Sequence, residues 1–252
     1  MSEKNAPDPA RQAKALAIHA RLCPIYGCPV PYFQSLDPLS ELVSTYLNHR
    51  TRNRDAKRAF ETLRARFPDW AAVRDAPSAD VQAAIAGVRW PERKAPGLRT
   101  LLAEVERRVG RLALDHLADM PAHAARAWLE ALPGVGPKTS AAVLSFSRLR
   151  GRALPVDSHH HRVAQRVGLI PARMDVGPSH GLLEGLLPDD WDAQSVYDHH
   201  QIFMRHGQRV CHWRKPDCGA CAISDLCDHA SKRVASASSR TADDGDAQAS
   251  LW

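Results

Sequence analysis

The sequence lacks a long apolar run. No segment approaches the roughly 18 residues that a membrane-spanning helix requires, and the N-terminus (MSEKNAPDPARQ) has no apolar signal segment. We therefore expect a cytoplasmic protein without a membrane partner, in a compartment where thiols stay reduced. In such a compartment the six cysteines favour metal binding or chemistry over disulfides.

A strand pattern is also missing, because β-branched residues nowhere alternate over a strand-length segment. Apolar residues recur instead with helical spacing. Over 53–67, Ala56, Phe60, Leu63 and Phe67 form one stripe, Asn53 is a suitable N-cap, and Pro68 ends the helix. We predict an all-α fold with further helices at 11–22, 39–50, 69–76, 78–86, 97–110, 121–131, 137–149, 158–168, 178–186 and 193–206.

The composition is that of a folded protein. The 252 residues are 44% hydrophobic and 25% charged, which excludes a wholly disordered chain and a disulfide-stapled mini-protein. The two ends differ: residues 1–8 are polar, and 231–252 are rich in Ser, Ala and Asp. We expect both ends to be disordered, with no explanation for the apolar Leu251 and Trp252.

Positive charge is clustered. The chain has 34 Lys and Arg against 28 Asp and Glu, a net charge of +6 and a pI near 9.2. The segment from 49 to 66 contains seven basic residues and only two acidic ones. The basic residues are Arg50, Arg52, Arg54, Lys57, Arg58, Arg64 and Arg66. Such a cluster fits either a polyanionic partner or an ordinary solvated helix face.

Four cysteines near the C-terminus have the spacing C-x6-C-x2-C-x5-C; they are Cys211, Cys218, Cys221 and Cys227. Structural zinc usually takes two short C-x2-4-C pairs, whereas one short pair with two longer arms suits a cubane iron–sulfur cluster. The spacing alone indicates a four-cysteine metal site.

Basic residues accompany this loop: Arg209, Arg214 and Lys215. They could offset the charge of an anionic cluster or contact phosphate. Cys23 and Cys28 lie far from the loop in sequence, and we interpret them as buried or incidental thiols rather than ligands.

A glycine-containing turn, LPGVGPKTS, lies between two helical segments. Gly134 and Gly136 flank Val135 and permit a tight turn whose N–H groups, with the next helix N-terminus, would bind phosphate. Pro137 suits the first helical position. An ordinary helix connection would look similar. Asp157 follows 19 residues after Lys138 and could simply cap the next helix.

Taken in order, these motifs resemble the endonuclease III family of helix-hairpin-helix DNA glycosylases with a [4Fe–4S] cluster. LPGVGPKTS, VDSH, the pair His199–His200, His206–Gly207 and the four cysteines follow one another along the chain. The resemblance spans 38–227. It implies a six-helix domain at 37–150 and a cluster domain built from 9–36 and 151–230, with DNA in the cleft between these two helical lobes.

The resemblance also implies residue roles. Lys138 matches the catalytic lysine and Asp157 the catalytic aspartate, while 134–136 match the phosphate-binding hairpin and the four cysteines the cluster ligands. His159 is counted among the expected DNA contacts. The run 159–161 consists of three histidines and looks like a metal-ligand tract, as does the pair His199–His200. The family's histidines at His159, His199, His200 and His206 are, however, explained by helix packing and hydrogen bonding.

The chemistry fits these identities. A neutral lysine amine can attack C1′ of the deoxyribose, displace the base and form a Schiff base, after which β-elimination breaks the strand. Lys138 at a helix start, beside other cations, would have its ammonium form disfavoured. Asp157 could shuttle protons and stabilise positive charge on the sugar. The base must first leave the stack.

Two segments depart from the family pattern. The family has a glutamine that fills the space left by the flipped nucleotide, and an acid nearby; here the positions hold His49 and Arg52, next to Arg50. Trp90 stands where the family inserts an apolar wedge. We expect His49 to become charged at mildly acidic pH and both residues to alter the substrate range; the alternative is that Trp90 packs in the core and His49 caps a helix or contacts phosphate.

The sequence thus predicts a monomeric, nucleoid-associated base-excision enzyme acting on double-stranded DNA that contains damaged bases or abasic sites. We expect an N-glycosylase for oxidised pyrimidines with lyase activity at abasic sites. The alternatives are a relative with shifted specificity that acts mainly as a lyase, and a non-catalytic protein that binds DNA damage. Lys138 and Asp157 together argue against the binding protein, which would need neither.

Overall fold

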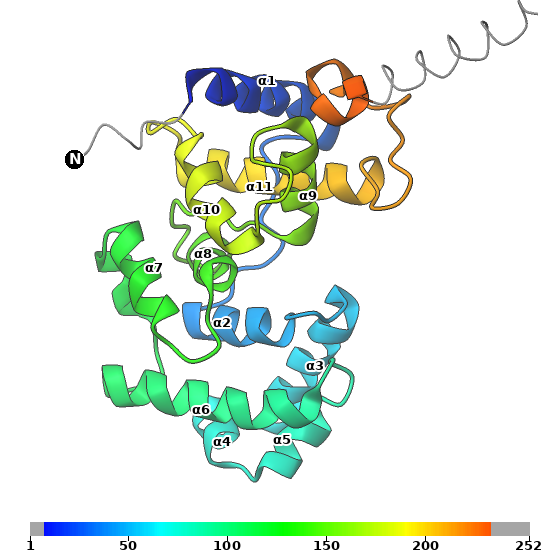
Figure 1. Ribbon diagram of the computed structural model, residues 1–252. Helices are drawn as coiled ribbons and strands as arrows, with labels where there is room; N and C mark the ends of the chain where they lie inside the picture. The colour runs from blue at the N-terminus through cyan, green and yellow to red at the C-terminus, as the bar shows by residue number, and fades with distance from the viewer. Residues whose placement is uncertain (1–7, 233–252) are drawn as a thin grey trace, which may run out of the picture. The chain divides into compact units, whose positions relative to one another are not determined.

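A computed structural model describes residues 8–232 of the chain (Figure 1). The predicted all-α fold is confirmed, because these residues form helices and loops and no β-strand. The ends expected to be disordered, including Leu251 and Trp252, lie almost wholly outside the described residues. Asp8 is described, and its carboxylate caps the first helix by accepting from the N–H of Ala10 at 3.0 Å.

The chain divides into two compact units. The described part of unit 1 comprises 8–30, 156–191 and 198–232, and unit 2 comprises Pro31–Pro155 and Asp192–Tyr197. None of the described helices is both long and apolar enough to cross a membrane.

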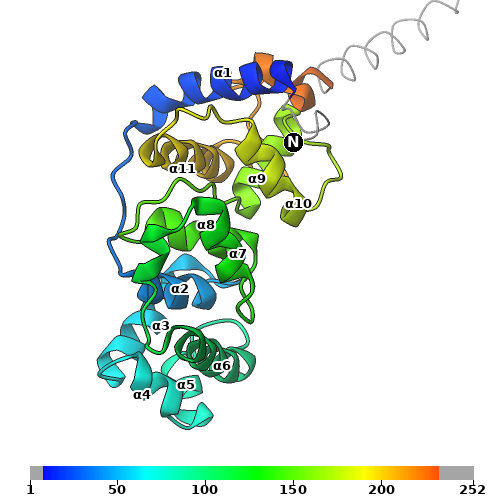
Figure 2. The ribbon, with the colours of Figure 1, turned by 90° about the vertical axis from the view of Figure 1, so that its left-hand side faces the viewer.

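Unit 2 contains seven α-helices and one 3-10 turn over its long segment. They are α2 (Pro38–Leu47), α3 (Asn53–Arg66), α4 (Trp70–Asp75), α5 (Ser78–Ala84), α6 (Pro91–Val109), η2 (Asp115–Asp119), α7 (Ala122–Glu130) and α8 (Pro137–Phe146). Helix α8 packs on α2 and α7, while α4 and α5 pack on α6 (Figures 1 and 2). Their apolar faces form one core, which includes Leu42, Leu98 and Val143.

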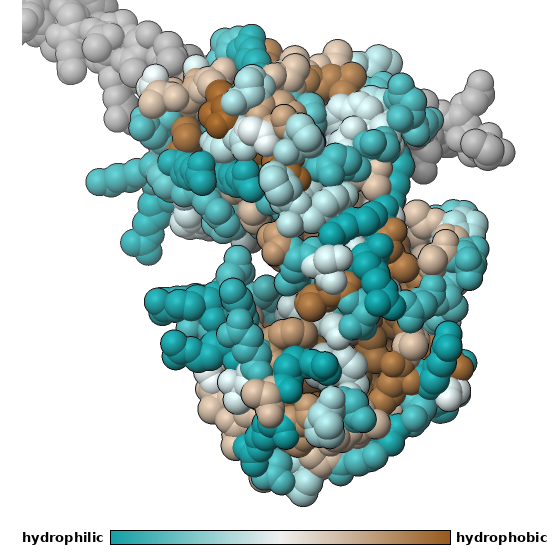
Figure 3. Space-filling view, turned by 180° about the vertical axis from the view of Figure 1, so that it is seen from behind, coloured by the Kyte–Doolittle hydropathy of each residue, from teal (hydrophilic) through white to brown (hydrophobic). Residues whose placement is uncertain are grey.

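Helix α3 follows the predicted stripe closely. Ala56, Ala59 and Leu63 are buried, and Phe60 and Phe67 are half-buried against the core. The N-cap position is Arg52, with Asn53 the first helical residue. All seven basic side chains of the 50–66 cluster are exposed, and Figure 3 shows hydrophilic side chains projecting from the part of unit 2 that carries α3.

Unit 1 contains α1 (Pro9–Tyr26), α9 (Ser158–Val167), α10 (Val176–Gly185), most of α11 (Ala193–Arg209) and the 3-10 turn η3 (Ser224–Leu226). Helices α1 and α11 lie side by side (Figures 1 and 2). Arg205 of α11 donates to the carbonyl of Tyr26 at 2.9 Å, and Asp198 accepts from the N–H of Val30 at 2.8 Å. These bonds fix the end of α1 against α11.

Helices α9 and α11 meet at a glycine. A Cβ atom on Gly207 would come within 2.9 Å of Cβ of His159, closer than such atoms approach in proteins. Arg162 of α9 donates to the carbonyl of Gly207 at 2.7 Å. The His-Gly pair at 206–207 is therefore explained by close helix contact.

Cys23 and Cys28 form a disulfide, contrary to the expectation of separate thiols. Helix α1 ends at Gly27, whose φ of 79° reverses the chain in the left-handed conformation that glycine favours. This turn brings Cys28 back beside Cys23, with 5.1 Å between their Cα atoms. The spacing in sequence did not reveal the turn.

Candidate active site and cysteine-lined cavity

The glycine-containing turn connects α7 to α8 as the sequence predicted. Gly134 has a φ of 76°, and a Cβ atom there would lie 3.1 Å from Cε2 of Tyr46. Val135 is buried and anchors the turn, while Gly136 occupies the N-cap position of α8. Lys138 is the second residue of that helix, next to its positive end.

Lys138 lies near a buried carboxyl group that the sequence analysis did not single out. Glu41 of α2 is only 2% exposed and accepts a hydrogen bond from Thr45 at 3.1 Å, and it also pairs with Gln34. Burial raises the pKa of Glu41 to about 7, although these hydrogen bonds and the charge of Lys138 act in the opposite direction. A proton-exchanging group thus lies within the electrostatic reach of Lys138 at neutral pH.

His49 follows α2 and is hydrogen-bonded beside Lys138. Its Nε2 lies 2.8 Å from Oγ1 of Thr139. Burial, foremost, together with the charges of Lys138 and Lys94, lowers the pKa of His49 to about 4. The expectation that His49 becomes charged at mildly acidic pH is therefore wrong, because the folded protein keeps the ring neutral there.

Lys94 of α6 holds the loop that carries His49. Its ammonium donates to the carbonyl of Leu47 at 2.7 Å, to the carbonyl of His49 at 2.8 Å and to Oγ1 of Thr51 at 2.9 Å. Burial lowers the pKa of Lys94 to about 8. Lys94 was not predicted from the sequence, although its helical spacing with Leu98 places it on a buried face.

Trp90 lies on the surface of unit 2, so the alternative that it packs in the core is wrong. Its side chain is 39% exposed, and the guanidinium of Arg89 stacks 4.3 Å from the centre of its ring. The backbone N–H of Arg89 donates to Oγ1 of Thr51 at 3.1 Å, which joins the Trp90 turn to the His49 loop. Arg50 and Arg52 are exposed on the same loop.

In unit 1, Asp157 caps α9. Its Oδ1 accepts from the N–H of His160 at 2.7 Å, so the helix-cap interpretation is correct as a structural statement. The carboxylate thus lies at the N-terminus of α9. Nδ1 of His159, one turn along, lies 3.1 Å from Nη2 of Arg162.

The four loop cysteines line one cavity in unit 1, together with residues of α9 and α11. Within the described chain, no three of their sulfurs lie within 4.8 Å of one another. The ligand atoms of one tetrahedral zinc ion, with bonds of about 2.3 Å, would be roughly 4 Å apart. Four thiols spread around a cavity fit a cubane cluster better than a single zinc ion.

Arginines of α9 hold this loop, which the sequence analysis did not predict. Arg166 donates to Sγ of Cys211 at 3.2 Å and to the carbonyl of Trp213 at 2.7 Å, and Arg162 donates to the carbonyl of Cys211 at 3.0 Å. Arg214, one of the basic residues within the loop itself, is exposed. Arg162 and Arg166 are one helical turn apart and so lie on the same face of α9. This spacing is the feature of the sequence that could have indicated their shared role.

Two solved structures share the fold of most of this chain. A thermostable thymine-DNA glycosylase superposes with a TM-score of 0.73, covering 88% of this chain and 99% of its own at 22% identity. A trapped covalent complex of endonuclease III with DNA gives a TM-score of 0.74, covering 88% of this chain and 98% of its own at 20% identity. The fold is thus that of the helix-hairpin-helix DNA glycosylases.

No protein-family model matches the chain. Endonuclease III of Escherichia coli K12 is 31% identical over 222 residues, which cover 88% of this chain and 98% of the relative. A putative DNA glycosylase of Arabidopsis thaliana is 30% identical over 173 residues, covering 69% of this chain, and the chain spans 57% of that relative's length. The chain belongs to the endonuclease III family, and it is a DNA glycosylase of base-excision repair.

Proposed function

We propose that this glycosylase also cuts the strand, using Lys138 as nucleophile. The observation that carries the proposal is the position of Lys138: it begins a helix, follows a phosphate-binding type of turn and lies near two titratable groups, Glu41 and His49. A lysine that only contacts phosphate would not require a neutral histidine and a buried carboxyl group around it.

In the proposed reaction the neutral amine of Lys138 attacks C1′ of the flipped nucleotide. The bond from C1′ to the base nitrogen breaks, and the base leaves with its electron pair and takes up a proton. Ring opening gives a Schiff base between Lys138 and C1′. Removal of a proton from C2′ then expels the 3′ phosphate by β-elimination, and water releases the lysine.

Asp157 would stabilise the positive charge that develops on the sugar and exchange protons with the leaving groups. Its cap hydrogen bond orients the carboxylate before substrate binds, so the group does not have to reorganise during the reaction.

DNA contacts would come mostly from unit 2. The backbone N–H groups of 134–136 suit a phosphate, and exposed Arg50 and Arg52 add positive charge beside the His49 loop. His159 is the proposed contact in unit 1. Each phosphate neutralised should contribute about −0.9 to the slope of log affinity against log salt concentration.

The four loop cysteines would hold a [4Fe–4S] cluster, which here supplies a rigid cross-link for the loop and no step of the reaction. The partner is double-stranded DNA with damaged bases or abasic sites, with oxidised pyrimidines the proposed bases. The enzyme would act as a monomer, and we expect it to be associated with the nucleoid.

A narrower activity, chiefly strand cutting at abasic sites, is the second candidate. The observation that favours it is His49, whose ring is half-buried and hydrogen-bonded to Thr139. At this position the family has an amide side chain that fills the space left by the flipped nucleotide. An abasic site contains no base to recognise, so this substitution would affect it least.

Borohydride trapping tests the nucleophile. Wild-type protein treated with borohydride during reaction with an abasic duplex should form a covalent adduct with the DNA. Lys138→Ala should abolish the adduct while duplex binding is largely retained, and Lys57→Ala, an exposed lysine of α3, serves as the matched control. Undiminished trapping by Lys138→Ala would place the nucleophile elsewhere.

A further inference from the structure

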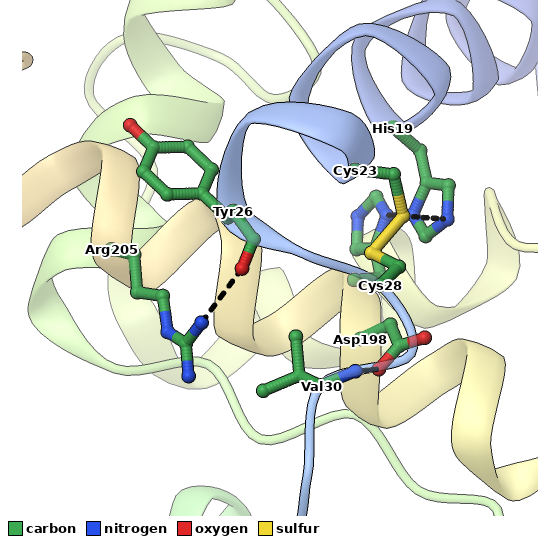
Figure 4. Close-up of a disulfide and its surroundings, with 8 residues drawn as sticks. His19, Cys23, Tyr26, Cys28, Val30, Asp198 and Arg205 are labelled. Atoms are coloured by element: carbon green, nitrogen blue, oxygen red, sulfur yellow. Dashed lines mark hydrogen bonds between the residues drawn. A yellow bond between two sulfur atoms is a disulfide. The ribbon is translucent and has the colours of Figure 1, made fainter.

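A second group of side chains that can bind metal lies at the end of α1. The proposed reaction uses none of them. His19 and Cys23 lie one turn apart on the helix, and Cys28 returns beside them after Gly27 (Figure 4). Nε2 of His19 is 3.3 Å from Sγ of Cys23, and this nitrogen and both sulfurs lie within 4.8 Å of one another. All three side chains are half-buried, so solvent can reach them.

The ring of His19 is oriented by unit 1. Its Nδ1 lies 3.3 Å from Nδ1 of His199, which is buried, and Trp191 packs against the ring with 4.5 Å between centres. Two ring nitrogens at this distance share one proton. With His199 as acceptor, His19 carries its proton on Nδ1, and the lone pair of Nε2 faces the sulfurs.

This arrangement is the usual support for a metal-bound histidine, whose second nitrogen donates to a neighbouring group. A histidine binds metal as the neutral imidazole, and this tautomer offers the sulfurs the unprotonated nitrogen.

We propose that reduction of the Cys23–Cys28 disulfide creates a zinc site formed by both thiolates and Nε2 of His19. A dithiol reductant supplies two electrons and two protons and is itself oxidised to a disulfide. A phosphine instead supplies the two electrons and becomes a phosphine oxide, while water provides its oxygen and the two protons. In both cases the S–S bond breaks and two thiols form. Zinc binding then releases these two protons, and water takes the fourth ligand position. Two thiolates and one imidazole are a ligand set that zinc prefers.

The oxidised and zinc-bound states exclude each other, because sulfurs joined in a disulfide offer no thiolate. Both states tie Cys28 to the last turn of α1 and leave the bond from Val30 to Asp198 in place. The site is separate from the four loop cysteines, which line a different cavity. Metal occupancy would therefore report the thiol–disulfide state of the protein.

The test is elemental analysis of the full-length protein with its iron retained. Anaerobic protein reduced with a phosphine, incubated with zinc chloride and desalted, should hold one zinc per chain, and protein oxidised with glutathione disulfide should hold none. Cys28→Ser should abolish zinc retention. His19→Gln should weaken zinc binding at least about 10-fold, and His123→Gln, which changes an exposed histidine of α7, should leave it unchanged.

Iron content and helical circular dichroism are measured on the same samples. His19→Gln keeps the disulfide, so it decides the question even where Cys28→Ser does not fold. Equal zinc in oxidised and reduced protein, or no zinc in the reduced protein, overturns the proposal. So does zinc retention by Cys28→Ser, or zinc uptake matched by loss of iron, which would assign the metal to the four-cysteine loop.

Discussion

Trp90 has a left-handed backbone, with φ of 58°, although it is neither glycine nor asparagine. Such a conformation costs on the order of 1 kcal/mol for a bulky residue. The strain holds an aromatic ring at the surface, stacked under Arg89. An exposed aromatic ring held in a strained backbone conformation is suited to entering the base stack when a nucleotide is flipped.

We predict that Trp90→Ala lowers kcat/KM for base excision from paired lesions by about 10-fold or more, from the loss of about 1–3 kcal/mol of base stacking. Cutting at abasic sites should change much less. Trp90→Phe keeps an aromatic face and should retain most activity. Equal losses on the two substrates in defined-lesion duplexes would assign Trp90 to general DNA binding instead.

At the scale of elements, the contact between α9 and α11 depends on Gly207. We predict that Gly207→Ala forces these helices apart, because the added methyl group meets backbone and Cβ atoms of His159 at 2.9–3.2 Å. The free energy of unfolding should fall by about 1–3 kcal/mol. Iron content should fall as well, since Arg162 links Gly207 to the carbonyl of Cys211.

Gly185 of α10 provides the matched control. A Cβ atom there meets nothing within 4 Å, so Gly185→Ala should be neutral or slightly stabilising in the same urea titration. A stable, iron-loaded Gly207→Ala protein would show that the two helices adjust without cost.

Helix positions were predictable where a local rule sets them. The apolar stripe and Pro68 placed α3 at 53–67, against the observed Asn53–Arg66. Helix α6 was predicted to begin at 97 but begins at Pro91, because Pro96 suggests a break whereas the helix continues through it. That error concealed Lys94. The partners of Glu41 and His49 depend on contacts between separate helices, and periodicity along one helix does not contain them.

For the whole molecule, buried neutral histidines set the dependence of stability on pH. His160 is fully buried among Phe203, His199 and His200, and neither of its ring nitrogens has a hydrogen-bond partner among the described residues. Burial, foremost, holds the pKa of His160 well below its ordinary value. The pKa of His49 is lowered to about 4 in the same way.

Between pH 6.5 and 4 the unfolded chain binds protons at these histidines that the folded protein does not bind. The free energy of unfolding therefore falls as the pH is lowered through this window. Glu41 acts oppositely, because its raised pKa of about 7 lets the folded protein bind the extra proton above pH 4.5. Burial also lowers the pKa values of His199 and His206. The histidines therefore outnumber this carboxyl group, and the net effect of lowering the pH is a loss of stability.

We predict that His160→Phe flattens this slope in urea unfolding measured from pH 7 to 4.5. His123→Gln, which changes an exposed histidine, should keep the wild-type slope. An unchanged slope in His160→Phe would mean that His160 acquires a proton in the folded state.

One hydroxyl group has a consequence for how base preference can change in this family. Oγ1 of Thr51 accepts from Lys94 and from the N–H of Arg89, and donates to the carbonyl of His49 at 3.2 Å. A hydroxyl makes three such bonds at most, so this one has no further hydrogen-bonding capacity. It links the segment 47–52 to the segment 85–90. A grafted 47–52 segment without a hydroxyl at position 51 would remove this acceptor from both Lys94 and the N–H of Arg89. We therefore expect substitutions that change base preference to occur in both segments together, and both should be exchanged in an engineered variant.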